Sequence, residues 1–320
     1  MQRFRFLKET GKAVFQDRYV KKASEMLQAW DGKNTGSVGI IGAPLSKPSI
    51  SHSGASFAPG VIRKMLFSYS TYSIEEDLDL ADISITDFGD ILMHPTNIVD
   101  SQQRIAETIE QIVSVNPKSL LIVLGGDHSI SYPSISGFQT HWKKVGIIQF
   151  DAHHDLRNLE DGGPTNGTPF RSLIETGTIQ GSQLIQIGIR DFANSKVYTE
   201  YGKEHGITIY TMKDIRNRDI KEIVKESVQQ LEKEVDAIYV SVDMDVLDQA
   251  YAPGCPAIGP GGMDSTSLLE AVALLGEYDI VKAIDIVEID PMIDFRDMTS
   301  RTAAWVIMQF LKGKKKTGQI

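Results

Sequence analysis

Asp151, His153 and Asp155 recur at every second position directly after the apolar run VGIIQF (145–150). Alternation by two is the period of a β-strand, so we predict that these three side chains point to one face of a strand. A buried face favours Val, Ile or Leu, whereas carboxylate and imidazole groups are typical metal ligands. The stretch therefore indicates a metal site.

Two further groups of the same kind follow apolar runs. LGGDHS contains Asp127 and His128, and SVDMDVLD contains Asp243 and Asp245. Ligands of open α/β sheets bind outside the carboxyl ends of the strands, so the three groups are expected at one edge. A single motif of this kind more often caps a helix or turn, but three motifs at three strand ends favour metal binding. We expect Asp127 to support its loop and His154, of opposite parity, to be structural.

Four carboxylates at one edge would repel one another strongly unless cations lay between them. Two divalent ions balance four Asp, with a bridging hydroxide as the additional anion. Carboxylate oxygens with two imidazoles favour Mn²⁺ over metals that prefer thiolate. We therefore expect two Mn²⁺ per subunit.

The elements that would position these groups alternate between strands and helices. The expected strands are 37–44, 83–89, 119–126, 145–155, 183–191, 207–211, 237–245 and 281–290; the expected helices are 101–114, 219–234, 266–275 and 302–311, the last ending at Gly313. Several strands are apolar on both faces, as in parallel sheets covered by helices. The pattern predicts a three-layer α/β/α sandwich with a mostly parallel central sheet. No break in composition divides it, so 1–320 is predicted to be one catalytic domain.

Composition excludes several classes of protein. The chain has 320 residues, a net charge of −9 and one short basic run at 312–316, which argues against nucleic-acid binding. The single cysteine, Cys255, excludes a disulfide framework and suits a reducing compartment. The N-terminal MQRFRFLKETGK lacks the apolar core of a signal peptide, and no run reaches membrane-span length. We expect a cytoplasmic protein without a membrane or nucleic-acid partner.

GGDHS, DAHHD and SVDMDVLD resemble the three metal signatures of the ureohydrolases, the family of arginase and agmatinase. The likeness covers nearly the whole chain, because GAPLSKPSISHSGASFAPGVIRK (42–64), DFGD (87–90), GIRD (188–191) and DIVEIDP (285–291) follow in the family's order. The resemblance implies an arginase-like fold, a homo-oligomer and a glutamate, Glu288, that holds the planar cation of the substrate. It also implies two ligand sets: His128, Asp151, Asp155 and Asp243 for one Mn²⁺, and Asp151, His153, Asp243 and Asp245 for the other.

Departures from the family pattern bear on the substrate. Arg157 stands where arginase-like members have an Asn that contacts the substrate carboxylate, and Ala193 stands where they have an Asp near its amino group. Asn166 replaces a proton-relaying His, and Arg171 adds a second cation nearby. Arginines suit carboxylates. The departures favour N-formimidoyl-L-glutamate, a small molecule with two carboxylates and no free α-amino group, as the substrate, which places the chain in histidine degradation.

The reaction implied is attack of the metal-bridging hydroxide on the amidine carbon, giving L-glutamate and formamide. Asp155 is the candidate to pass a proton to the leaving nitrogen, and Glu288 would hold the amidinium. Arg157 and Arg171 could instead be surface charges. Two alternatives stay open: a guanidino-acid hydrolase, such as a guanidinobutyrase, that releases urea, and a non-catalytic metal-binding protein on the same scaffold.

Overall fold

The computed structural model describes residues 17–33 and 35–320. Its centre is a nine-stranded sheet in the order β1-β5-β2-β6-β11-β10-β7-β8-β9. Every neighbouring pair of strands in this sheet is parallel, as predicted. The strands are β1 (Leu27–Ala29), β2 (Val38–Ala43), β5 (Ile85–Asp90), β6 (Leu120–Gly125), β7 (Val145–Phe150), β8 (Leu184–Ile189), β9 (Thr208–Thr211), β10 (Ala237–Asp243) and β11 (Val281–Val287).

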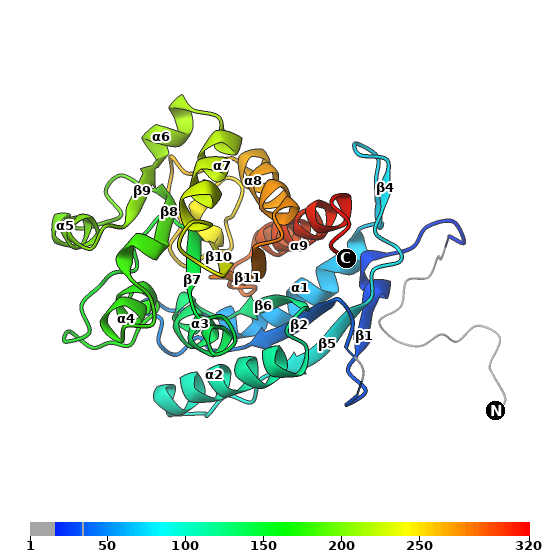
Figure 1. Ribbon diagram of the computed structural model, residues 1–320, viewed down its shortest axis with the longest axis horizontal. Coiled ribbons are helices and arrows are strands. Elements are labelled where there is room, and N and C mark those ends of the chain that lie inside the picture. Colours follow the sequence, from blue (N-terminus) through cyan, green and yellow to red (C-terminus); the bar gives the residue numbers. More distant parts are fainter. Residues whose placement is uncertain (1–16, 34) are drawn as a thin grey trace.

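Helices cover both faces of the sheet (Figure 1). One face packs on α2 (Ile98–Val115), α3 (Ser131–Gln139) and α4 (Pro169–Glu175). The other packs on α1 (Ala58–Met65), α7 (Ile220–Leu231), α8 (Ser265–Glu277) and α9 (Met298–Lys316). The remaining helices are α5 (Lys196–Glu204) and α6 (Met212–Asn217). The predicted three-layer α/β/α sandwich is thus confirmed.

Helix α2 illustrates how local sequence places a layer. The side chain of Asn97 caps its first turn by accepting from the backbone N–H of Asp100 at 3.0 Å. Ile105, Ile109 and Val113 then recur at intervals of four and are buried against the sheet. The polar residues between them face outward, so one amphipathic pattern sets both the helix and the face that it buries.

All eight predicted strands are present, while β1 and the short hairpin of β3 (Tyr72–Ser73) with β4 (Leu78–Asp79) were not predicted. The predicted helix stop at Gly313 is wrong, because α9 continues to Lys316. Gly313 is instead where α8 and α9 meet: a Cβ there would lie 2.1 Å from the backbone oxygen of Ala273. Its lack of a side chain permits close helix packing.

None of the helices in residues 17–33 and 35–320 combines the length and the apolar character that a membrane span requires. The N-terminal stretch MQRFRFLKETGK, considered above for a signal sequence, lies outside these residues.

Candidate metal centre

The three predicted groups of ligands follow β6, β7 and β10. These strands and β11 are adjacent in the sheet, in the order β6-β11-β10-β7, and all run parallel. Their carboxyl ends therefore lie at one edge, which is where α/β sheets bind ligands. Glu288 follows β11 and joins the same edge.

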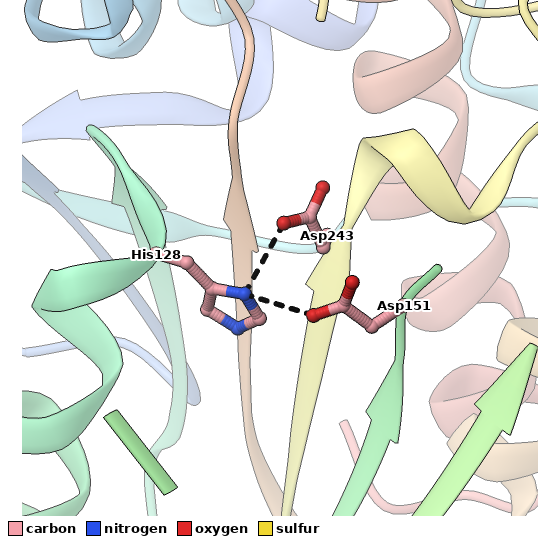
Figure 2. Close-up of side chains that lie close together, drawn as sticks. All are labelled: His128, Asp151 and Asp243. Atoms are coloured by element: carbon pink, nitrogen blue, oxygen red, sulfur yellow. Dashed lines mark ion pairs between the residues drawn. The ribbon is translucent and has the colours of Figure 1, made fainter. Parts of the chain in front are cut away.

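His128 stands at the centre of one group of ligands. Its Nδ1 lies 3.1 Å from Oδ2 of Asp151, 2.9 Å from Oδ2 of Asp155 and 3.2 Å from Oδ2 of Asp243. Figure 2 shows the imidazole pointing at the carboxylates of Asp151 and Asp243 from a separate element. His128, Asp151 and Asp243 are buried and bring their ligand atoms within 4.8 Å of one another.

A second group shares Asp151 with the first. Nδ1 of His153 lies 3.0 Å from Oδ2 of Asp245 and 3.5 Å from Oδ1 of Asp151. Asp151, His153 and Asp245 also bring their ligand atoms within 4.8 Å. Two adjoining groups that share one carboxylate are the arrangement that a pair of metal ions requires.

The orientation of the His128 ring fits a cation and not merely a hydrogen-bond network. The hydroxyl of Ser241 donates to Oδ1 of Asp285 at 2.7 Å, so the Ser241 oxygen accepts the Nε2–H of His128 at 2.9 Å. Nδ1 then directs a lone pair at the carboxylates, and it has no hydrogen-bond partner among the described residues. A lone pair and several anionic oxygens that converge on one point stabilise a cation there.

The pKa values report the same crowding of charge. Burial lowers the pKa of His128, but Asp151, Asp155 and Asp243 outweigh it and raise that pKa well above its usual value. Burial and the charge of Asp151 raise the pKa of Asp155 to about 6. Burial, Asp245 and Asp151 raise the pKa of Asp243 well above its usual value. Buried carboxylates that lie close to one another are stabilised by a cation bound between them.

The predicted ligands do come together, but not by alternating along a strand as the sequence had suggested. β7 ends at Phe150, so Asp151, His153 and Asp155 lie in an irregular turn and do not alternate along a strand. Asp155 has a left-handed backbone with φ of 51°. Asp245 likewise lies beyond β10, in the 3-10 helix η6 (Met244–Val246). Turns after each strand bring the ligands together, which strand geometry alone would not.

Glu288 occupies a left-handed backbone position with φ of 60° directly after β11. Its Oε1 accepts from the backbone N–H of His128 at 2.8 Å and from Nδ2 of Asn166 at 2.9 Å. Oε2 takes part in neither bond. Burial, and next the nearby Asp127, raise the pKa of Glu288 to about 8. A buried carboxylate with one oxygen uncommitted suits a planar cationic ligand.

A cavity of about 370 Å³ opens over these groups. Its lining includes His153, Asp155, Arg157, Asn166, Asp243, Asp245 and Glu288, together with Asn194 and Ser195 just before α5 and Tyr198 in its first turn. The Arg157 guanidinium forms no ion pair or hydrogen bond with any residue of 17–33 or 35–320. The stem of Arg157 crosses Gly167, where a Cβ would lie 2.6 Å from Cδ of Arg157.

Arg171 is not brought to this cavity. Its guanidinium pairs with Glu175 one turn along α4 and stacks on the ring of Tyr201 at 3.7 Å. The expected second substrate cation therefore does not line the cavity. Cys255 is buried in the core.

The residues that support the ligands were not predicted. They include Ser241 and Asp285 behind His128, and Gln149, which donates from Nε2 to Oδ2 of Asp151 at 2.6 Å. All three are buried within strands that are mostly apolar. A polar residue in the interior of such a strand was the available signal. Asp127, expected to support its loop, accepts from the backbone N–H of Ser129 at 3.0 Å.

A parallel α/β sheet with two adjoining Asp/His groups at its carboxyl edge defines a metal-dependent hydrolase of the arginase fold. The sequence model of the Arginase family matches residues 36–312, and the chain belongs to that family.

Within the family, the chain is similar to formimidoylglutamases. It is 60% identical over 314 residues to the formimidoylglutamase of Halalkalibacterium halodurans, with 98% of each chain covered. It is 49% identical to that of Bacillus subtilis strain 168, again over 98% of each. The crystal structure of formimidoylglutamase from Bacillus subtilis strain 168 superposes with a TM-score of 0.94 and covers 98% of this chain and 97% of that one.

Proposed function

We propose that this chain is a formimidoylglutamase that hydrolyses N-formimidoyl-L-glutamate to L-glutamate and formamide. The observation that carries the proposal is the 60% identity to a formimidoylglutamase over nearly the whole of both chains. The His/Asp groups and Glu288 at one cavity agree with it, because they provide a metal site beside a carboxylate for the amidinium.

We propose that the site holds two Mn²⁺ ions. His128, Asp151, Asp155 and Asp243 would bind one, and Asp151, His153, Asp243 and Asp245 the other. Oxygen-dominated ligands with two imidazoles support the choice of Mn²⁺. When bound, such a metal pair supplies a nucleophilic hydroxide at neutral pH.

The protein's own groups would hold the substrate. Oε2 of Glu288 is placed to accept N–H bonds from the amidinium, while Oε1 stays anchored on His128 and Asn166. Asn166 would therefore act through Glu288, by fixing its carboxylate plane. The guanidinium of Arg157, which lines the cavity, would bind a substrate carboxylate. Asp155 would carry a proton on its carboxylate to the leaving glutamate nitrogen.

We further propose that residues 1–320 form one catalytic domain that acts in the cytoplasm as a homo-oligomer. A lone cysteine supports a reducing compartment. Met292, Ile293 and Phe295 are all exposed on one short segment, as at many subunit interfaces. Light scattering of the purified protein would test the oligomer.

A product assay tests the proposed activity. The Mn²⁺-loaded protein is offered N-formimidoyl-L-glutamate, arginine, agmatine and 4-guanidinobutyrate separately, and glutamate, formamide and urea are measured. Glutamate and formamide from the first substrate alone are expected. Urea from a guanidino compound would refute the substrate, and no product from any of them would refute the activity.

A further inference from the structure

A line of four polar side chains, the last of them half-buried and the other three buried, connects Asp151 to helix α5. It consists of Gln149, Gln186, His154 and Thr199. The two glutamines are paired residues of the adjacent strands β7 and β8 and are completely buried. A strand interior normally carries apolar residues, and an unpaired amide there costs about 1–3 kcal/mol. Polar side chains at these positions therefore indicate a function for the hydrogen bonds that they form.

The direction of every hydrogen bond follows from the carboxylate at one end. Asp151 can only accept, so Nε2 of Gln149 donates to its Oδ2 at 2.6 Å. Oε1 of Gln149 is thereby left to accept from Nε2 of Gln186 at 2.7 Å. Oε1 of Gln186 then accepts from Nδ1–H of His154 at 2.7 Å.

Independent contacts give the same orientation. Nε2 of Gln149 also lies 3.2 Å from the backbone oxygen of His153, and Nε2 of Gln186 lies 2.8 Å from that of His154. Both amide nitrogens thus face only acceptors, and both amide oxygens face only donors. With Nδ1 protonated, Nε2 of a neutral His154 is an acceptor, and the hydroxyl of Thr199 lies 3.0 Å from it and 3.1 Å from the backbone oxygen of Ser195. The relay requires the single O–H of Thr199 to donate to His154.

The line ends at a wall of the active-site cavity. Thr199 lies in the first turn of α5, next to Ser195 and Tyr198, which line the cavity. Asn194, another lining residue, accepts the backbone N–H of His154 at 2.8 Å and donates to the backbone oxygen of Ala152 at 2.9 Å. The turn that carries the ligands is therefore held from β8 and from the start of α5.

We propose that Gln149, Gln186 and His154 form a positioning relay that orients the shared metal ligand Asp151 and couples its orientation to helix α5. The inference rests on the proposed function, because it takes Asp151 as a metal ligand. His154 acts in it as a neutral ring with the proton on Nδ1. Groups that orient metal ligands typically change metal affinity about 10–100-fold when removed.

The test measures Mn²⁺ affinity and not turnover. Dissociation constants are measured by titration calorimetry for the wild type, Gln149→Met and Gln186→Met, with thermal unfolding to verify the fold. Gln183→Met is the matched control, because Gln183 is also buried and hydrogen-bonded, to the backbone of Gln180, but lies outside the relay. Weaker Mn²⁺ binding in the two relay variants, by about 10-fold or more for Gln149→Met, is expected, with the control unchanged. Wild-type affinity in both relay variants would overturn the proposal, as would an equal loss in the control.

Two substitutions at His154 separate the hydrogen bond from mere packing. Asn places an N–H near the position of Nδ1, so His154→Asn should retain more Mn²⁺ affinity than His154→Leu. Equal losses would contradict the relay.

A neutron diffraction map of the Mn²⁺-loaded wild type tests the relay without any variant. Deuterium is expected on Nδ1 of His154 and not on Nε2 alone, and the opposite tautomer would overturn the assigned direction. Absence of Mn²⁺ binding by the wild type would refute the proposed function itself, and a neutron map of the metal-free protein would then decide the tautomer of His154 and with it the direction of the relay.

Discussion

Replacing Glu288 by Gln tests the proposed grip on the substrate with little change of shape. The Gln carbonyl can still accept from the backbone N–H of His128 and from Asn166, the two bonds that Oε1 now makes at 2.8 and 2.9 Å. The change falls on the second oxygen, where an NH₂ donor replaces an acceptor. The amidinium would then face a donor in place of an anion.

The expected loss follows from the bonds removed. Two hydrogen bonds from a cation to a carboxylate contribute about 1.5–3 kcal/mol each. Loss of both, about 3–6 kcal/mol, lowers kcat/KM by about 10²–10⁴-fold. Mn²⁺ content should not change, because Glu288 contacts the backbone of His128 and not its ring.

The assay is glutamate release by wild type and Glu288→Gln at matched Mn²⁺ content. Asp127→Asn is the control, since Asp127 is a fully buried carboxylate beside Glu288 that does not line the cavity. A kcat/KM of Glu288→Gln close to the wild-type value would refute the role. A similar loss of kcat/KM in Asp127→Asn would mean that the effect comes from disturbed local packing.

The other predictions concern three further residues. Asp155→Asn should abolish turnover because it removes the proton carrier; full activity with both metals retained would contradict this. Arg157→Gln should raise KM about 10–100-fold, with little change in kcat, because it removes a charged hydrogen bond of about 1.5–3 kcal/mol. Arg171→Gln should leave KM unchanged, because Arg171 lies outside the cavity. A KM of Arg157→Gln equal to that of the wild type would refute the contact. Burial lowers the pKa of Lys314 to about 7 from 10.5, so folding favours its neutral form and the free energy of unfolding should rise from pH 7 to pH 10.5. In Lys314→Met this rise in the free energy of unfolding should be smaller by up to about 5 kcal/mol. Denaturant unfolding that shows the same pH dependence for wild type and variant would contradict the prediction.

Sequence reasoning succeeded where the signal was local. Strands such as VGIIQF and AIYVSVD were identified because they are apolar on both faces, and the structure buries every residue of both. It failed at Gly313, where a local rule predicted a helix end. A tertiary contact explains this glycine instead, since α8 approaches α9 too closely for a side chain at that position.

The proposed substrate cations show the same limit. The sequence made both Arg157, next to the ligand run, and Arg171, farther along the chain, candidates to bind the substrate. Arg157 lines the cavity and its guanidinium has no partner among residues 17–33 and 35–320, whereas Arg171 pairs with Glu175 and stacks on Tyr201. Which of two arginines is available depends on neighbours that come from distant segments of the chain, and sequence spacing does not record them.

The sequence by itself determined the parallel α/β class and the residue types at three strand ends, because an apolar run followed by ligating residues is a local property of the chain. Only the tertiary structure decided how the ligands meet. Strand order makes β6, β11, β10 and β7 neighbours, and irregular turns with left-handed backbone at Asp155 and Glu288 direct side chains inward. It also decided which buried groups, Ser241 behind His128 and Gln149 behind Asp151, orient the ligands. Hydrogen bonds across a sheet depend on strand register, which exists only once the chain has folded.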